Sequence, residues 1–227
     1  MVAFGMRRVD TFREPVVPGK VLRLEDVRGI HEGKIGVLFG KGPSLDSWDL
    51  PRRGDDIWAT VNEACQVVSS PDYSFISDCG PLTHLKSVGW HPKDGTVMIG
   101  NNRRLKHMND RDWLEWVTGE DGTVLYYNPV PEDVKGGSSP CIMLYIFKLM
   151  GIDRVLMVGF DAWSDPDRSS WSDKVNASVS NPRTKHDYGP SNETIARALR
   201  DTGIAPVWWH LEEDLVREGW HEESLGE

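Results

Sequence analysis

The sequence has few cysteines and no long hydrophobic segment. Cys65, Cys79 and Cys141 are its three cysteines, and no two of them form a C-x-x-C pair. A disulfide framework or a zinc site is therefore not expected, and the cysteine usage favours a reducing cytoplasm. No apolar run is long enough to span a bilayer, and residues 1–10 lack the apolar core of a signal peptide. We expect no membrane partner.

Positive charge is also scarce, with 26 Lys and Arg against 35 Asp and Glu and a net charge of −9. This balance disfavours nucleic acid as a partner, although a local basic cluster would still allow it. The sequence contains neither G-x-x-x-x-G-K-[ST] nor G-x-G-x-x-G, so a P-loop and a dinucleotide Rossmann site are unsupported. Tryptophan is abundant, with 10 residues in a chain of 227. Tryptophans pack cores and also stack on sugar and base rings, and their number alone does not separate these uses.

The most informative stretch runs from Ile35 to Leu45. Its first five residues, Ile-Gly-Val-Leu-Phe, predict a strand buried on both faces. The next five, Gly-Lys-Gly-Pro-Ser, form a turn in which glycines permit positive φ and close approach of a ligand. Pro43 and Ser44 suit the first turn of a short helix, whose N-terminus can bind an anion. The stretch predicts either a phosphate-binding loop or an ordinary strand–turn–helix corner.

Short apolar strands alternate with helices along the rest of the chain. We predict further strands at residues 20–24, 56–61, 73–77, 96–99, 124–127, 154–158 and 207–209, and helices at 81–87, 141–150 and 192–201. Ser139 and Ser191 are the expected N-caps of the last two helices, with Pro140 at the first helical position. This order predicts an α/β fold, a Rossmann-like, doubly wound and mostly parallel sheet. We expect an irregular N-terminal arm (1–33), one domain (34–211) with a polar lid-like loop (163–190), and an acidic tail (212–227).

Polar residues follow several of the predicted strands. In an open α/β sheet, ligands bind beyond the carboxyl ends of the strands. The residues at these ends are Gly40, Lys41, Gly42, Pro43, Ser44, Asn62, Asp78, Asn101, Asn102, Asn128, Asp161 and His210. Each one alone is explained by turn formation. Together with Ser138 and Ser139, they predict a polar crevice in which two helix N-termini share a phosphorylated ligand.

None of the seven histidines pairs with another at metal-ligand spacing. His186, which precedes Asp187 in the lid-like loop, is a candidate general base because the pKa of histidine suits neutral pH. A solvated loop histidine is the simpler alternative. The basic run at residues 103–107 is either a contact for phosphate or an acidic acceptor, or a solvated surface.

Two blocks of this sequence resemble the bacterial sialyltransferase-like fold. The first is Gly40-Lys41-Gly42-Pro43-Ser44-Leu45 with Asn62 after the next strand. The second is Ser138-Ser139-Pro140 through Gly151, followed by Val155 through Gly159-Phe160-Asp161. The same blocks mark a related family of flagellin-glycosylation proteins and archaeal 6-hydroxymethylpterin diphosphokinases, and the segment from Pro71 to Asp78 looks more like that branch.

The resemblance implies a transferase domain that uses a nucleotide. The resemblance to the sialyltransferases implies a donor activated by cytidine monophosphate, and a reaction that needs no metal. The predicted nucleotide site comprises Gly40, Lys41, Gly42, Pro43, Ser44, Asn62, Asp78, Ser138, Ser139 and Trp163, with His186 and Asp161 as the catalytic residues. The sequence departs from the pattern in three places. Lys41 replaces the usual Asn, Trp163 stands where a Tyr is expected, and Pro190 occupies the expected position of the catalytic His.

Three functions are compatible with these residues. The first is a metal-independent glycosyltransferase that moves a sugar from a nucleotide-sugar donor to a hydroxyl of a glycan, protein or other acceptor. The second is an ATP- and Mg²⁺-dependent diphosphokinase acting on a pterin-like alcohol, with Asp78 and Asp161 as metal ligands. The third is a nucleotide-binding protein without catalysis. No tightly bound cofactor is expected, and the oligomeric state stays open, with a homo-oligomer among the possibilities.

Overall fold

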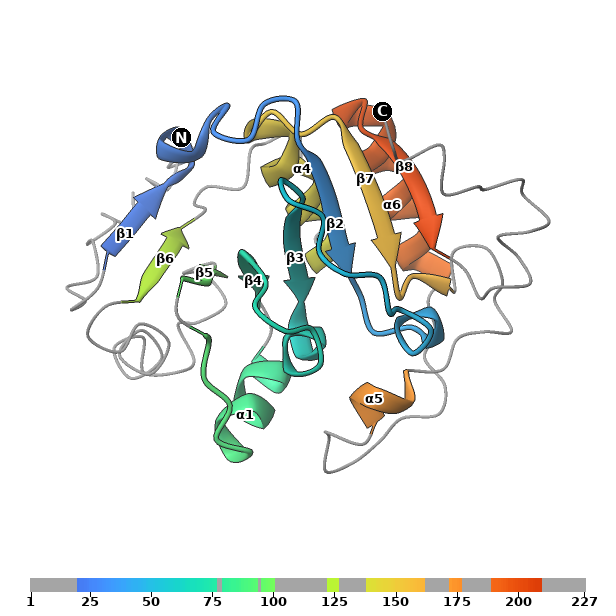
Figure 1. Ribbon diagram of the computed structural model, residues 1–227. Coiled ribbons are helices and arrows are strands. Elements are labelled where there is room, and N and C mark those ends of the chain that lie inside the picture. Colours follow the sequence, from blue (N-terminus) through green and yellow to red (C-terminus); the bar gives the residue numbers. More distant parts are fainter. Residues whose placement is uncertain are drawn as a thin grey trace, which may run out of the picture.

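The computed structural model describes residues 20–76, 79–93, 95–100, 122–126, 138–161, 172–176 and 189–209. They form one eight-stranded sheet with helices on its two faces (Figure 1). The strands are β1 (Lys20–Arg23), β2 (Ile35–Phe39), β3 (Ile57–Val61), β4 (Tyr73–Phe75), β5 (Val97–Gly100), β6 (Thr123–Tyr126), β7 (Arg154–Val158) and β8 (Ala205–Trp209). Their order is β1-β6-β5-β4-β3-β2-β7-β8, and every neighbouring pair is parallel. The predicted α/β, doubly wound fold is confirmed.

The face of the sheet on which each helix lies depends on the direction in which the chain crosses the sheet. They are α1 (Cys79–Ser87), α4 (Ser139–Leu149), α5 (Asp173–Asn176) and α6 (Gly189–Thr202), with 3₁₀ turns η1 (Leu24–Val27), η2 (Pro43–Leu45) and η3 (Asn62–Gln66). From β2 to β6 the chain moves along the sheet in one direction, with η2, η3 and α1 on one face. It then returns through α4 to β7, on the other side of β2. Because such crossovers are right-handed, α4 and α6 cover the opposite face (Figure 1).

Most boundaries differ from the predicted ones by one to three residues, and the start of the last helix differs most. The last helix begins at Gly189, not at Ser191, because Pro190 fits a first helical turn that needs no N–H donor. The last strand begins at Ala205, where Pro206 is tolerated on an edge strand. The described part of the predicted lid (163–190) includes the short helix α5. None of the described helices has the length and apolar character required to cross a membrane.

The face under α4 and α6 is apolar and tightly packed. Leu38, Phe75 and Phe147 are fully buried there, in one cluster with the inner residues of both helices. A Cβ at Gly36 would lie 2.8 Å from Cε2 of Phe147, so glycine at this position allows α4 to approach β2 closely. The described parts of α4 and α6 therefore cover the central strands closely on this side.

The opposite face carries a cluster of aromatic rings. Phe39 packs edge-to-face with Trp48 and Trp58, at centroid distances of 5.3 Å and 5.2 Å, and Trp48 packs in the same way on Trp209 at 5.1 Å. Such pairs add about 0.5–1.5 kcal/mol beyond the burial of their area. Part of the tryptophan content is therefore core packing.

His31 attaches the segment after η1 to the amino end of the sheet. Its Nε2 lies 2.7 Å from the hydroxyl of Tyr73, and its backbone N–H donates to the carbonyl of Met150 at 2.9 Å. Burial lowers the pKa of His31 below its usual value of 6.5, and the charge of Lys34 acts in the same direction, while Asp72 opposes both. Burial and then Asp72 raise the pKa of Tyr73 to about 12.

We expect His31 to make the protein less stable in mild acid. Because the pKa of His31 is lower in the folded state, the unfolded chain binds the proton more readily, and stability falls as the pH drops below the unfolded value. Thermal unfolding followed between about pH 7.5 and about pH 5.5 should show a flatter dependence in His31→Gln than in the wild type. His91→Gln, at an exposed position, should keep the wild-type slope. Equal slopes in all three proteins would contradict this role.

Candidate functional site

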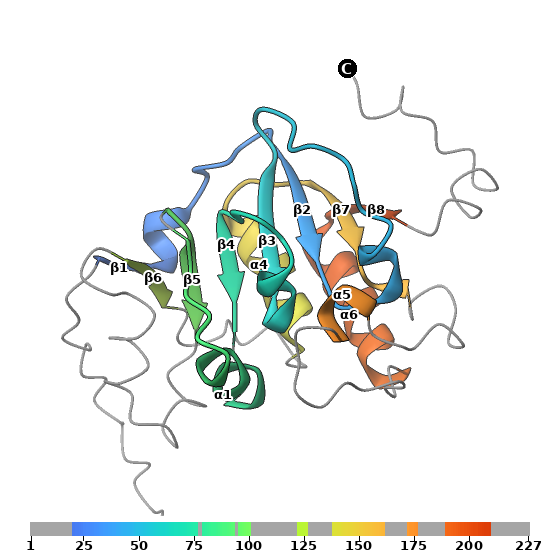
Figure 2. The same ribbon diagram turned by 60° about the horizontal axis from the view of Figure 1, so that its bottom comes forward.

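The strand order changes direction between β2 and β7, which are the third and second strands from the β8 edge of the sheet. In doubly wound sheets the ligand crevice lies at this switch point, beyond the carboxyl ends of the two strands. Here β2 is followed by residues 40–44 (the first loop) and β7 by residues 159–161 (the second loop). Figure 2 shows both strands ending side by side at the same edge of the sheet, where α5 and η2 also lie.

The two loops are hydrogen bonded to each other. The N–H of Gly42 donates to the carbonyl of Gly159 at 2.7 Å, and the N–H of Gly159 donates to Oγ of Ser44 at 2.9 Å. The N–H of Ser44 donates to Oδ2 of Asp161 at 2.9 Å. Ser44 is 0% and Asp161 1% exposed. The sequence predicted an anion at the start of η2. In the structure this position is taken by the carboxylate of Asp161.

This arrangement changes the interpretation of the glycines and of Asp161. A Cβ at Gly42 would lie 2.2 Å from Oδ2 of Asp161, and one at Gly40 would lie 2.5 Å from the carbonyl oxygen of Gly159. Both glycines thus make room for the neighbouring chain segment, because β2 and β7 are adjacent strands. Asp161, predicted to be catalytic, is buried and acts in this structure as a positioning residue for the first loop.

Lys41 makes an ion pair on the other side of the first loop. Its Nζ lies 2.8 Å from Oε2 of Glu63, and the two side chains are 17% and 7% exposed. The carbonyl of Lys41 accepts a hydrogen bond from the N–H of Ser172 at 2.7 Å. The sequence suggested that Lys41 contacts phosphate. In the structure its ammonium group is held by a carboxylate and joins the first loop to η3.

Asn62 is the first residue of η3, directly after β3. Its φ is +53°, and among the described residues only Ser70 shares a positive φ without being glycine. Asparagine tolerates this region better than most residues because its side chain is short and polar. Its Oδ1 atom is buried and accepts no hydrogen bond from the described residues. A buried acceptor left unpaired costs about 1–3 kcal/mol, so Asn62 is a site where a ligand donor would be favourable.

The N-terminus of α4 reaches the same edge because α4 runs opposite to the strands. The N-cap is Ser138, one residue before the predicted Ser139, and Pro140 occupies the first turn. The Ser138 hydroxyl makes no capping hydrogen bond and lies 2.9 Å from Sγ of Cys141 instead. Ser139 is buried within the first turn. Backbone N–H groups and the helix dipole at such an end favour an anion.

Several predicted site residues lie outside the described part of the chain: Asp78, Asn101, Asn102, Asn128, Trp163, His186 and His210, together with the basic run 103–107. Their roles stay predictions. The described residues contain no cluster of three or more His, Cys, Asp or Glu side chains that could hold a metal ion. The structure thus brings together the first loop, Asn62 and Asp161 at one edge.

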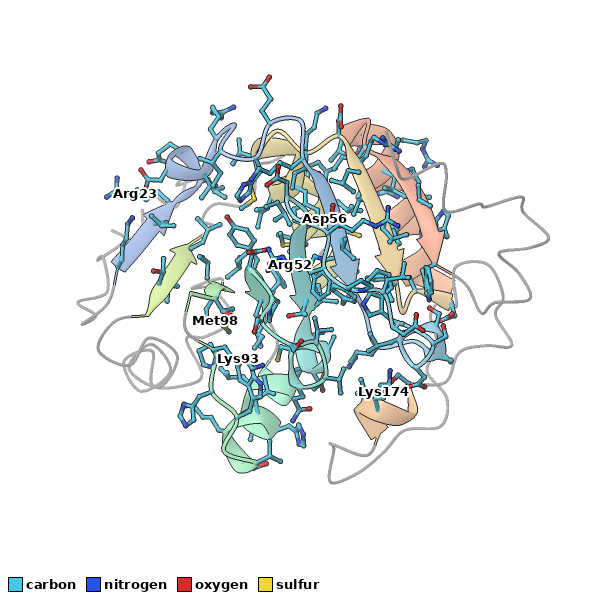
Figure 3. The ribbon with its side chains drawn as sticks, in the orientation of Figure 1. Arg23, Arg52, Asp56, Lys93, Met98 and Lys174 are labelled. Carbon is cyan, nitrogen blue, oxygen red and sulfur yellow. The ribbon has the colours of Figure 1, made fainter. Side chains whose placement is uncertain are left out.

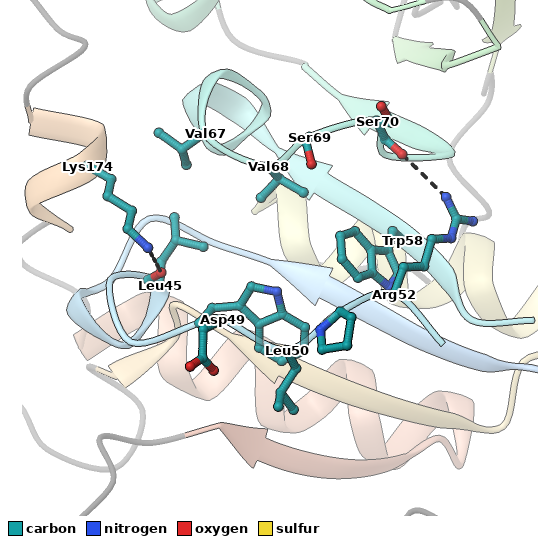
Figure 4. Close-up of a pocket in the computed structure, with 12 residues that line it drawn as sticks. Leu45, Asp49, Leu50, Arg52, Trp58, Val67, Val68, Ser69, Ser70 and Lys174 are labelled. Atoms are coloured by element: carbon teal, nitrogen blue, oxygen red, sulfur yellow. Dashed lines mark hydrogen bonds between the residues drawn. The ribbon is translucent and has the colours of Figure 1, made fainter. Parts of the chain in front are cut away.

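A groove on the aromatic face was not predicted from the sequence. It encloses about 480 Å³ and is lined by Leu45, Trp48, Trp58, Val68, Ser70 and Lys174, among others (Figure 4). The Arg52 guanidinium lies 5.7 Å from the centre of the Trp58 ring and donates to the carbonyl of Asp56 at 3.0 Å (Figure 3). The high tryptophan content was the sequence signal for this groove, but it does not say where the rings gather.

Comparisons with known proteins give the following matches. No family model matches the sequence, and no curated protein matches it. Among solved structures, sialyltransferase CST-II in complex with a trisaccharide acceptor and CMP is 11% identical, with a TM-score of 0.43 over 78% of this chain and 81% of that chain. A variant of CST-II with CMP is 13% identical, with a TM-score of 0.48 over 78% and 80%. The apo α-2,3-sialyltransferase from Campylobacter jejuni is also 13% identical, with a TM-score of 0.43 over 78% and 75%.

These matches are to the class of protein that the two sequence blocks resemble. Their TM-scores are all below 0.5 and their identities are 11–13%, so they carry no argument about the site. The functional argument therefore depends on the residues of this chain.

Proposed function

We propose that this protein is a transferase that uses a nucleotide-activated donor, and specifically a glycosyltransferase that moves a sugar to an acceptor hydroxyl. The observation that carries the proposal is Asn62, held at φ +53° at the carboxyl end of β3 with its side-chain oxygen buried and unpaired among the described residues. Residues held in rarely populated conformations cluster at functional sites. An unpaired carbonyl oxygen requires a donor, which a ribose hydroxyl or a base amino group supplies.

The neighbouring elements suit the rest of a nucleotide. The first turn of α4, which carries Ser138 and Ser139, presents backbone N–H groups toward the edge where β2 and β3 end. The first loop is held by Asp161 on one side and by the Lys41–Glu63 pair on the other. A loop fixed in this way provides a rigid wall for a ligand. The expectation that the nucleotide is a cytidine nucleotide rests on the sequence resemblance.

The proposed reaction is a displacement at the anomeric carbon of the donor. The acceptor hydroxyl forms the new C–O bond, the bond from the anomeric carbon to the nucleotide phosphate breaks, and the phosphate leaves with the electron pair. A general base takes the proton of the hydroxyl, and we assign this role to His186. Trp163 is predicted to contact the nucleotide.

A thermal-shift screen tests the proposal directly. CMP, UDP, GDP, ADP, ATP and their sugar conjugates are added with and without Mg²⁺, and unfolding is followed. A ligand at 100 times its Kd stabilises a protein by about 2.7 kcal/mol. Stabilisation by a nucleotide-sugar or its nucleotide product without metal supports glycosyl transfer. Stabilisation only by Mg²⁺-ATP would replace the proposal with the diphosphokinase. No shift with any nucleotide would remove the donor site.

Two substitutions at one position separate binding from folding. Asn62→Gly and Asn62→Ala both remove the side-chain amide. We expect each to weaken the binding of the nucleotide identified in the screen by roughly 5-fold, because one hydrogen bond is lost. Asn62→Gly should leave the ligand-free protein at least as stable as the wild type, because it also removes the unpaired acceptor. Asn62→Ala should be about 1 kcal/mol less stable than Asn62→Gly, because φ is +53°. Ser70→Gly, at the other positive φ, is the control and should leave the Kd unchanged. An unaltered Kd in both Asn62 variants would exclude Asn62 from the site.

A further inference from the structure

The groove on the aromatic face is built by segments that are distant in sequence. Its walls come from the segment after η2, from β3, from the turn after η3 and from α5 (Figure 4). Its volume of about 480 Å³ falls in the range of small-molecule sites. Leu45, the residue after Ser44, is one of its lining residues, so one wall of the groove is continuous in sequence with the first loop of the candidate donor site.

The lining combines an apolar wall with a polar rim. Trp48 and Trp58 stand at 75° to each other with ring centres 6.0 Å apart. Trp58 is 7% exposed and Trp48 is half-buried, so Trp48 offers the larger apolar surface. Exposed polar groups of Asp49, Ser69 and Ser70 lie along the same groove. A sugar ring has this character as well, with apolar C–H faces and hydroxyls around its edge. Carboxylate and hydroxyl oxygens of the rim accept hydrogen bonds from sugar hydroxyls.

Among the described residues that line the groove, Lys174 is the cation that is not paired with a carboxylate. Arg52 also lines the groove, but its guanidinium is paired with the carboxylate of Asp72. Lys174 is exposed, and no carboxylate among the described residues pairs with it; its Nζ lies 3.4 Å from the carbonyl oxygen of Leu45. A single ammonium group suits a single carboxylate, whereas a phosphate-rich ligand would meet repulsion from Asp49.

The position of Lys174 is set by the fold. Oδ1 of Asp46 accepts hydrogen bonds from Oγ of Ser172 at 2.6 Å and from the backbone N–H of Lys174 at 3.0 Å. These contacts dock α5 on the segment after η2. On the opposite side, Arg52 donates to the carbonyl of Ser70 at 3.3 Å, which holds that residue at φ +54°. Both ends of the groove are thus held in place.

We propose that this groove binds a saccharide that carries a carboxylate, and that it is the acceptor subsite of the transfer reaction. The carboxylate lies at Lys174, the sugar ring packs on Trp48, and its hydroxyls face Asp49 and the serines. The assignment as acceptor rests on the proposed glycosyl transfer. The binding of a saccharide in the groove does not depend on that proposal.

Two ligands that differ only in the carboxylate test the proposal. Methyl glucuronide and methyl glucoside are titrated into the full chain and followed by the indole N–H resonances in NMR, with Trp58 assigned through Trp58→Phe. We expect the glucuronide to shift the Trp48 and Trp58 signals and to bind more tightly than the glucoside. Lys174→Met should weaken the binding of the glucuronide by about 10-fold, as expected for the loss of a hydrogen bond to a charged group. The affinity for the glucuronide should then be close to that for the glucoside. Lys93→Met, an exposed lysine outside the groove, should have no effect.

Several outcomes would overturn the saccharide site. These are no shift of either tryptophan signal, equal binding of the two ligands, or unchanged binding in Lys174→Met. Displacement of the glucuronide by CMP would show that the groove holds the donor nucleotide instead. Failure of the proposed function is seen separately, as the absence of any nucleotide effect in the thermal-shift screen, because the glucuronide titration contains no nucleotide.

Discussion

Replacing Gly42 with alanine is expected to destabilise the ligand-free protein by about 3 kcal/mol, the upper part of the range for overpacking. The added Cβ would lie 2.2 Å from Oδ2 of Asp161 and 2.8 Å from the carbonyl oxygen of Gly159. Neither atom moves easily, since Asp161 accepts the N–H of Ser44 and Gly159 is hydrogen bonded to Gly42 and Ser44. The melting temperature should fall by roughly 6–12 °C in a chain of this size.

Calorimetry or circular dichroism melts of the ligand-free protein measure this effect. Gly54→Ala is the matched control, because no atom lies within 4 Å of the added Cβ, and its stability should change by less than about 0.5 kcal/mol. The experiment separates two roles of the loop glycine. If Gly42 served only to let a phosphate approach, Gly42→Ala would keep the stability of the ligand-free protein and lose nucleotide affinity.

The second large effect is expected in catalysis. Under the proposed function, His186→Ala should lower kcat by about 10²–10⁴-fold, the usual loss for a general base. The donor is the nucleotide-sugar identified by thermal shift, and its Kd should stay unchanged in the variant, because His186 is assigned to the acceptor proton. The dependence of kcat on pH near neutrality should disappear together with the histidine.

His91→Ala provides the control for this substitution, since His91 is an exposed histidine on the segment after α1. It should retain wild-type kcat. Wild-type activity in His186→Ala would place the base elsewhere in the chain. A wild-type protein that binds the donor without turnover would favour the nucleotide-binding protein without catalysis.

The two candidate sites share the segment of residues 40–52. Its first half is held between β7 and η3 through Asp161 and the Lys41–Glu63 pair, and its second half forms one wall of the groove. A ligand at the edge of the sheet and one in the groove would thus be placed on neighbouring parts of one rigid segment. Under the proposed function, this shared segment would link the donor and the acceptor sites.

Local sequence patterns determined much of the fold. Residues 35–39 and 155–158 are short apolar runs, and a strand covered on both faces is the structure in which such a run satisfies its backbone and buries its side chains. The helix at Ser139–Leu149 follows from proline in its first turn and from an almost continuous apolar surface. The alternation of such elements, with right-handed crossovers, was sufficient to predict the doubly wound sheet.

The contacts of the site were decided only by the tertiary structure. Ser44 and Asp161 are 117 positions apart, and nothing in the pattern around either residue indicates that the carboxylate fills the space beside Gly42. Lys174 reaches the wall of the groove through a contact with Asp46 that spans 128 positions. Periodicity and turn chemistry act over a few residues, whereas these contacts depend on which strands become neighbours. The sequence therefore predicted where the sheet has its polar edge, and the packing of distant segments decided which groups remain there for a ligand.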